Sequence, residues 1–136
     1  MEHRIRSVHP PAILMVEDDR ETSTIYADYL ESKGFRVLLT RDPAEGIRLA
    51  EEEQPALILM DLLLPRMSGC AAIRELKSRP ATAHIPVLAM TASSLEVDRR
   101  EAREAGCNAF LEKPCVPQQL LRQVDALLGD PFKGSG

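Results

Sequence analysis

The sequence is short of the residue types that several classes of protein need. Its 136 residues include no tryptophan and only three phenylalanines and two tyrosines, so it lacks the aromatic platforms on which single-stranded nucleic acids stack. The 17 basic residues are scattered among 21 acidic ones, and the net charge is −4. No basic stripe for DNA or anionic lipid is visible, and we therefore expect no direct nucleic-acid partner.

Long hydrophobic runs and paired cysteines are also lacking. The apolar stretches 56–60 and 62–64 are separated by Asp61 and stay far below the roughly 20 residues that cross a bilayer. The first eight residues contain no apolar region of the kind that a secretion signal needs, so we expect a cytoplasmic protein without membrane contact. Cys70, Cys107 and Cys115 show no C-x-x-C spacing, which favours reduced, half-buried thiols over disulfides or a zinc site.

Five short apolar runs alternate with helix-like segments along the chain. They cover residues 12–16, 35–39, 56–60, 86–90 and 109–111. Most of them lack the polar alternation of a half-exposed strand, which is typical of parallel sheets covered on both faces. The pattern predicts an α/β fold with a five-stranded, doubly wound parallel sheet in a three-layer sandwich.

Helical periodicity fills the gaps between these runs. A first apolar stripe comprises Ile25, Tyr26, Tyr29 and Leu30, with Gly34 as its C-terminal cap, and a last one comprises Leu120, Leu121, Val124, Leu127 and Leu128. Weaker stripes predict helices over 43–53, 69–79 and 95–105, the last with Leu95 on its apolar side. Pro10–Pro11 near one end and Gly129-Asp130-Pro131 near the other predict an arm at 1–11, one domain at 12–129 and a tail at 130–136.

Polar residues gather where the predicted strands end. Three acidic residues at 17–19 follow the first run, Asp61 follows the third, Thr91 the fourth and Lys113 the fifth. Ligands of doubly wound sheets bind at these carboxyl ends. Converging carboxylates repel one another unless a cation lies among them, and oxygen-only ligands favour Mg²⁺. A lysine and a threonine would bind phosphate oxygens, and Asp61 could then act as a nucleophile that forms an aspartyl phosphate.

Four short motifs occupy these positions. They read ILMVEDD at 13–19, LMDLLLPRMSG at 59–69, MTA at 90–92 and FLEKP at 110–114. Together, and in this order, they resemble the receiver domain of two-component response regulators over residues 12–129. The resemblance implies a CheY-like, flavodoxin-like fold with strand order 2-1-3-4-5. It also implies a phosphorylation-activated signalling switch of a two-component system or phosphorelay, which catalyses only its own phosphorylation and dephosphorylation.

The resemblance assigns roles to individual residues. Asp61 would be the phosphoacceptor, and Lys113 would pair with it or with its phosphoryl group, next to a Lys113–Pro114 bond that is typically cis. Thr91 would bind a phosphoryl oxygen. Phe110 would be the switch aromatic that turns inward, although as phenylalanine it lacks the hydroxyl of the commoner tyrosine.

A divalent cation, Mg²⁺ or Mn²⁺, is also implied by the resemblance. Asp18 and Asp61 would bind it directly, Glu17 largely through water, and Leu63 through its backbone carbonyl. Asp19 is then an extra acid beyond this set. His3, His9 and His84 show no metal-ligand spacing, and we expect them at the surface rather than in a phosphorelay role.

The implied partners are a sensor histidine kinase or a histidine phosphotransfer protein, and a downstream protein. The downstream protein would bind the fourth helix, fifth strand and fifth helix, near 94–105 and 110–128, with the chain a monomer or a switch-face dimer. Leu63 stands where a polar residue is common in receivers that dephosphorylate quickly, and Ser93 is small. An aliphatic side chain cannot orient an attacking water, so we expect a long-lived phosphoryl group.

Plainer interpretations remain for these residues. Asp61 could start a turn, Asp18 and Asp19 could cap a helix, Thr91 could cap the next one, and Lys113 could be a solvated charge. Two other functions are open as well. One is a degenerate receiver that only binds proteins, and the other is a phosphatase of the haloacid-dehalogenase type. The phosphatase class needs a second aspartate two residues after the first, where this chain has Arg20.

Overall fold

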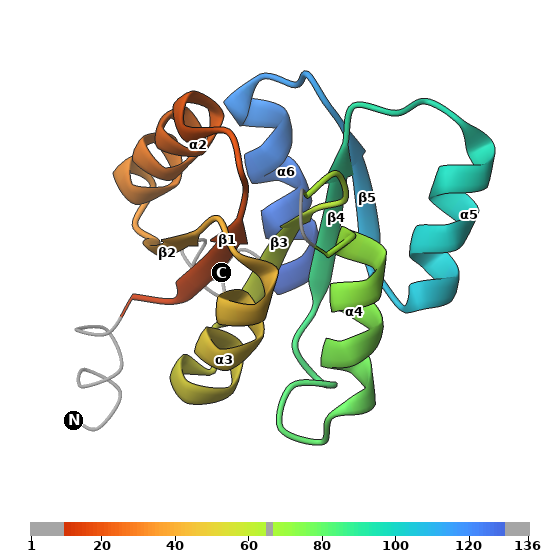
Figure 1. Ribbon diagram of the computed structural model, residues 1–136. Coiled ribbons are helices and arrows are strands. Elements are labelled where there is room, and N and C mark those ends of the chain that lie inside the picture. The colour runs from red at the N-terminus through yellow and green to blue at the C-terminus, as the bar shows by residue number, and fades with distance from the viewer. Residues whose placement is uncertain (1–9, 65–66, 130–136) are drawn as a thin grey trace.

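Five strands alternate with five helices in residues 10–64 and 67–129, the part of the chain that the computed structural model describes (Figure 1). The strands are β1 (Ala12–Val16), β2 (Arg36–Thr40), β3 (Leu57–Asp61), β4 (Val87–Thr91) and β5 (Ala109–Glu112). The helices are α2 (Arg20–Ser32), α3 (Pro43–Glu53), α4 (Gly69–Ser78), α5 (Glu96–Ala105) and α6 (Pro117–Leu128). Most of the predicted N-terminal arm and the predicted tail at 130–136 lie outside the described residues.

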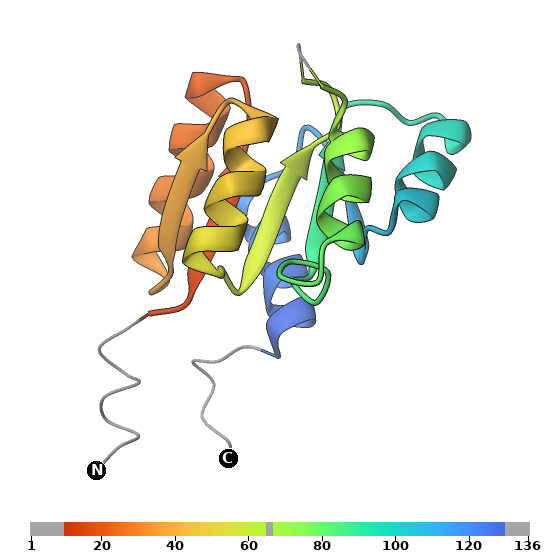
Figure 2. The same cartoon turned by 60° about the horizontal axis from the view of Figure 1, so that its bottom comes forward.

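The strands form one parallel sheet in the order β2-β1-β3-β4-β5. This confirms the predicted fold class and strand order. All five carboxyl ends meet at one edge of the sheet, whereas β1 begins and α6 ends at the opposite edge (Figure 2). The register pairs Val16 with both Thr40 and Met60, and Asp61 with Met90. Residues just beyond β1, β3 and β4 are therefore neighbours in space.

Helices cover both faces of the sheet and create two apolar cores. On one face α2 and α6 pack over residues such as Ile13 and Leu59, and on the other α3, α4 and α5 pack over residues such as Leu14 and Ile58 (Figure 1). Every residue of the three central strands is buried. No helix among the described residues is long and apolar enough to cross a membrane.

The two edge strands differ from the expectation of complete burial. Strand β2 is only partly covered, and Leu39 is 47% exposed. Strand β5 is half-buried along most of its length. An edge strand pairs on one side only, and helices above a twisted sheet lie mainly over its centre. An apolar run in the sequence predicts a strand here but does not predict its place in the sheet.

Two predicted helix stripes need correction. In α2 the buried residues are Ser23, Tyr26, Ala27 and Leu30, whereas Ile25 is 53% exposed. Serine and alanine let the helix approach the sheet closely, so the buried face is rotated away from the apolar stripe. Leu95 precedes α5 in extended conformation and is 61% exposed, so it does not line the core. Gly34, with φ of 103°, does follow the end of α2 as predicted.

Gly69→Ala is expected to destabilise the protein because a Cβ has no room at the start of α4. The atom would lie 2.3 Å from the backbone oxygen of Asp61 and 2.6 Å from Cα of Leu62. Crowding against backbone should lower the free energy of unfolding, measured in urea, by about 1–3 kcal/mol. Gly46→Ala is the comparison and should cost less, because its Cβ would meet a side-chain atom, Cγ2 of Val16 at 2.8 Å, rather than backbone. Equal losses in the two variants would contradict this explanation.

Candidate functional site

Backbone pairing at the carboxyl edge of the sheet brings the predicted site residues together. Asp61 and Thr91 are the last residues of β3 and β4, and Glu17 and Lys113 directly follow β1 and β5. The N–H of Glu17 donates to the carbonyl of Thr40 at 3.0 Å, and that of Lys113 donates to the carbonyl of Thr91 at 2.7 Å. The backbone hydrogen bonding of the sheet thus continues into the loops and fixes the backbone positions from which the Glu17 and Lys113 side chains extend.

A lysine and two carboxylates form the centre of the site. Lys113 Nζ donates to Glu17 Oε1 at 2.8 Å and lies 3.7 Å from Asp61 Oδ2. The backbone N–H of Leu63 donates to Asp61 Oδ1 at 3.1 Å. The N–H of Asp19 donates to Glu17 Oε2 at 3.0 Å. Lys113 therefore lies beside Asp61, as the resemblance implies, but its closer partner is Glu17.

The burial of these carboxylates is electrostatically costly. Glu17 is 3% exposed and Asp61 is 6% exposed. Burial raises the pKa of Asp61 from 3.8 to about 6, and the charge of Glu17 adds to the rise, while Leu63 N–H and Lys113 oppose it. Burial lowers the pKa of Lys113, but its hydrogen bond with Glu17 and the charge of Asp61 outweigh this effect and raise it overall. Glu17 and Asp61 share the positive charge of Lys113, so a further positive charge would stabilise the two carboxylates.

Thr91 and Phe110 lie where the switch residues were predicted. Thr91 is 1% exposed, and its hydroxyl oxygen accepts from Ser93 N at 3.2 Å. Ser93 in turn hydrogen-bonds the carboxylate of Asp98 in α5. The ring of Phe110 is half-buried, and the Arg99 guanidinium carbon lies 5.0 Å from its centroid. These contacts connect the loop after β4, α5 and β5 to the site.

The other two acids of the 17–19 run have separate partners. The carboxylate of Asp19 accepts from Thr22 N at 3.1 Å and caps α2, as the plainer interpretation has it. Asp18 Oδ1 lies 3.6 Å from Nη2 of Arg41, which follows β2. Among the described residues no group of three or more acidic, histidine or cysteine side chains is gathered as it would be around a metal ion.

Two pockets are lined in part by residues of this site. A pocket of about 170 Å³ has Leu63, Ser68, Cys70, Thr91 and Glu101 in its lining, on the side of α4 and α5. Leu63 is 64% exposed.

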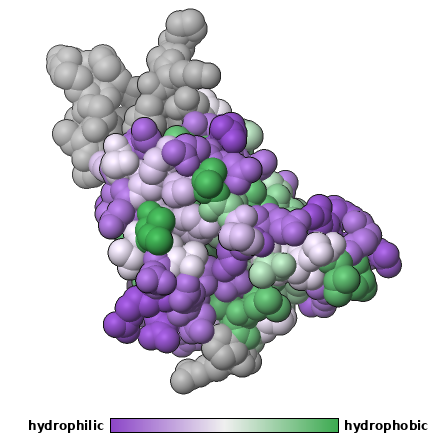
Figure 3. All heavy atoms as spheres, turned by 90° about the horizontal axis from the view of Figure 1, so that it is seen from above, coloured by the Kyte–Doolittle hydropathy of each residue, from purple (hydrophilic) through white to green (hydrophobic). Residues whose placement is uncertain are grey.

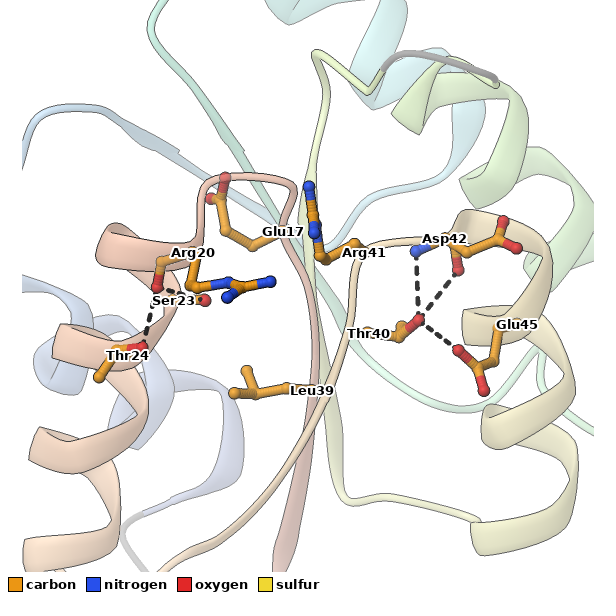
Figure 4. Close-up of a pocket in the computed structure, with 9 residues that line it drawn as sticks. All are labelled: Glu17, Arg20, Ser23, Thr24, Leu39, Thr40, Arg41, Asp42 and Glu45. Carbon is orange, nitrogen blue, oxygen red and sulfur yellow. Dashed lines mark hydrogen bonds between the residues drawn. The ribbon is translucent and has the colours of Figure 1, made fainter.

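A larger pocket of about 430 Å³ lies between α2, β2 and the start of α3 (Figure 4). The guanidinium of Arg20 extends into its space, and Thr40 forms part of the far wall, hydrogen-bonded to Glu45 at 2.8 Å.

Several site contacts were not anticipated from the sequence. They are the ion pair of Asp18 with Arg41, the stacking of Arg99 on Phe110, and the bond from the Tyr26 hydroxyl to the Cys115 carbonyl at 3.0 Å. Each contact joins residues that are not neighbours in the sequence, and no local sequence pattern predicts it.

Three other expectations are met. The Lys113–Pro114 bond is cis, the three cysteines are free, although Cys70 is buried rather than half-buried, and His84 is exposed. His3 and His9 lie outside the described residues.

The chain belongs to the response regulator receiver domain family, whose profile matches residues 13–125. The family, the fold and the carboxyl-edge site together define a phosphorylation-activated signalling switch of two-component systems. This favours the receiver interpretation over a phosphatase of the haloacid-dehalogenase type.

Known relatives agree with this assignment. The polar-differentiation response regulator DivK of Brucella anthropi is 35% identical over 121 residues, which cover 89% of this chain and 98% of that protein. The receiver domain of a sensor histidine kinase from Pseudomonas aeruginosa PAO1 is 35% identical, with a TM-score of 0.82, over 88% of this chain and 98% of that one. Its crystal structure has a magnesium ion coordinated in the active site cleft. Chemotaxis protein CheY4 of Vibrio cholerae, 22% identical, shares the fold with a TM-score of 0.83 over 88% of this chain and 99% of that one.

Proposed function

We propose that Asp61 is the phosphoacceptor of this receiver and that Lys113 and Thr91 assist the transfer. The observation that carries the proposal is the setting of Asp61, a buried carboxylate at the end of β3. It lies 3.7 Å from Lys113 Nζ and accepts a hydrogen bond from Leu63 N–H. A phosphoryl group on Asp61 would bring negative oxygens toward the ammonium of Lys113 and the hydroxyl of Thr91.

The donor set at this edge suits a divalent cation. Asp18 and Asp61 would hold Mg²⁺ with the backbone carbonyl of Leu63, and Glu17 would act through water. All of these are oxygen donors, which hard cations prefer, and Mn²⁺ fits the same set. When bound, the ion supplies charge neutralisation to the transferred phosphoryl group. The raised pKa of Asp61 and the magnesium-containing receiver of Pseudomonas aeruginosa support this assignment.

The transfer follows from these positions. A phosphohistidine of a sensor kinase or phosphotransfer protein presents its phosphorus to the Asp61 carboxylate. An oxygen of Asp61 forms the new P–O bond as the P–N bond to imidazole breaks, and the imidazole nitrogen keeps the electron pair. Lys113 Nζ, 2.8 Å from Glu17 Oε1, turns toward the new phosphoryl oxygens. The chain performs no chemistry beyond its own phosphorylation and dephosphorylation.

Phosphorylation would be transmitted through β4 and β5. The Thr91 hydroxyl moves to a phosphoryl oxygen and gives up its bond from Ser93 N. Phe110 turns into the space that Thr91 leaves, away from the guanidinium of Arg99. The resulting change affects the face of α5, β5 and α6, which binds a downstream protein or a second copy of the chain.

Exposed apolar side chains on elements that adjoin the site favour a protein as the phosphoryl donor. Ile25 on α2, Leu63 after β3 and Val116 before α6 are 53%, 64% and 54% exposed. In the view of Figure 3, hydrophobic surface occurs as small patches among hydrophilic side chains. Exposed apolar residues of this kind commonly mark protein contacts. We place this contact, with a kinase or phosphotransfer protein, in the cytoplasm.

The experiment that tests the proposal measures the intact mass of the protein after incubation with acetyl phosphate and Mg²⁺. We expect one added phosphoryl group, located on Asp61 by peptide mapping after borohydride reduction, and no adduct when EDTA is present. Absence of an adduct would overturn the proposal in favour of a receiver that only binds proteins. Continuous phosphate release from a generic phosphomonoester would favour a phosphatase.

Leu63→Asn is expected to shorten the lifetime of the phosphoryl group. The wild-type side chain is aliphatic and cannot hold an attacking water, whereas an amide can orient one, so hydrolysis should become roughly tenfold faster. The decay of the mass adduct after removal of the phosphodonor gives the rate. Leu95→Asn is the matched control, because Leu95 is also a solvent-exposed leucine, at 61%, but belongs to another loop. A wild-type half-life of seconds in Mg²⁺ buffer would contradict the expected long-lived state.

A further inference from the structure

Asp18 differs from its two acidic neighbours in having an arginine as the partner of its side chain. Glu17 is buried against Lys113, and Asp19 caps α2 through Thr22 N. The Asp18 carboxylate instead lies 3.6 Å from the guanidinium of Arg41, with the two side chains 44% and 60% exposed. The structure therefore holds one of the proposed cation ligands in an ion pair.

The partner residue is placed there by the sheet itself. Val16 and Thr40 are paired in register, and Glu17 N–H donates to the Thr40 carbonyl at 3.0 Å. Arg41 is the next residue after Thr40, and Asp42 directly afterwards caps α3. The backbone of Arg41 is thus fixed on both sides. In Figure 4 its side chain extends to the same side as the carboxylate of Glu17, away from Leu39.

The pairing has a consequence for the acceptor site. Within the described residues no three acidic side chains are gathered around one point. Asp61 and Glu17 already meet at Lys113, and Asp18 is the acid that is missing from the cluster. A cation coordinated by Asp18 and Asp61 together would compete with the guanidinium of Arg41 for the charge of the Asp18 carboxylate.

We propose that Arg41 competes with the divalent cation for the Asp18 carboxylate and thereby weakens the binding of Mg²⁺ to this receiver. The inference rests on the proposed function, because it assumes that Asp18 is a cation ligand. Arg41 acts here as a positioning residue, since it touches neither the phosphoryl group nor Asp61. The exposed ion pair is weak, so its removal should tighten Mg²⁺ binding by about two- to fivefold.

Isothermal titration with Mg²⁺ alone, without a phosphodonor, tests this competition. We expect a dissociation constant about two- to fivefold lower for Arg41→Gln than for the wild-type protein. Arg20→Gln is the matched control. Arg20 is an exposed arginine of the neighbouring pocket, and its loss removes the same charge without removing an ion pair to Asp18. Its dissociation constant should remain close to the wild-type value.

A double-variant cycle separates the ion pair from general charge effects. In an Asp18→Asn background, Arg41→Gln should no longer change the Mg²⁺ dissociation constant. Equal tightening in the Arg41→Gln and Arg20→Gln variants would overturn the inference, as would an unchanged dissociation constant for Arg41→Gln. Absence of Mg²⁺ binding by the wild-type chain would instead overturn the proposed cation site itself. The two failures are therefore distinguishable.

Discussion

Asp61→Asn is expected to make the metal-free protein more stable at about pH 8, by roughly 2–3 kcal/mol. Asp61 is buried, and its pKa is raised from 3.8 to about 6, first by burial and then by the charge of Glu17. The asparagine is uncharged, and its carbonyl oxygen retains the acceptor for Leu63 N–H. The variant therefore removes a repulsive charge and keeps the local hydrogen bond.

The pH dependence of this difference has a definite sign. A carboxyl with a raised pKa binds its proton more tightly in the folded protein than in the unfolded chain. Below about pH 4 Asp61 is protonated in both the folded and the unfolded state, so it has little effect on the free energy of unfolding. As the pH rises through about 6 the folded state must release that proton, so the contribution of Asp61 becomes fully unfavourable. The gain in stability of Asp61→Asn should therefore develop between about pH 4 and about pH 6 and remain constant at higher pH.

Urea denaturation at a series of pH values, in EDTA, measures the difference. Asp28→Asn is the control, because Asp28 is an exposed residue of α2 and the same chemical change there should leave stability nearly constant. Asp61→Asn should at the same time fail to form the phosphoryl adduct, since an amide is not a nucleophile. A variant less stable than the wild type at the higher pH would contradict the charge argument.

Lys113→Met is expected to be strongly destabilising and to slow phosphorylation. Methionine has a similar length but no charge, so Glu17 and Asp61, which are 3% and 6% exposed, lose the cation they share. Removing one partner of a buried charge group costs about 3–5 kcal/mol. The rate of adduct formation from acetyl phosphate should also fall by about 100-fold, because the ammonium no longer stabilises the transferred phosphoryl group.

The double variant Lys113→Met/Glu17→Gln separates the two roles of the lysine. Glu17→Gln removes one of the two unpaired charges, so it should restore much of the stability while the phosphorylation rate stays low. Unfolding free energies and adduct rates of the four proteins in the cycle provide the test. A Lys113→Met variant with wild-type stability would show that the carboxylates are not held by this cation.

The sequence predicted the central elements of the fold well. Strand β1 and helix α3 have the expected bounds, because fully apolar runs and a proline at a helix start are strong local signals. β2, β3 and β4 begin and end one residue later than expected. As a result, Asp61 and Thr91 belong to the strands themselves. Asp61 is paired in register with Met90 of β4, and Thr91 with Glu112 of β5, and this pairing keeps the buried carboxylate in place.

The parts that could not be predicted depend on tertiary contacts. The exposure of Ile25 is set by how closely α2 approaches the sheet, and that distance depends on small residues elsewhere in the helix. The pairing of Asp18 with Arg41 depends on which loop lies beside β1. The preference of Lys113 for Glu17 over Asp61 depends on distances of about an ångström, which motifs do not encode.

The edge of the sheet at which β1 begins and α6 ends lies opposite the proposed acceptor site, and this affects how the molecule can be tethered. β1 begins at Ala12 and α6 ends at Leu128, both at the edge of the sheet far from Asp61 (Figure 2). A surface anchor or a fused protein attached beyond either residue would therefore leave the carboxyl edge of the sheet, which carries Asp61, facing open solution. Immobilisation of the protein on a surface through such an anchor should therefore leave the proposed acceptor accessible to a phosphodonor in solution.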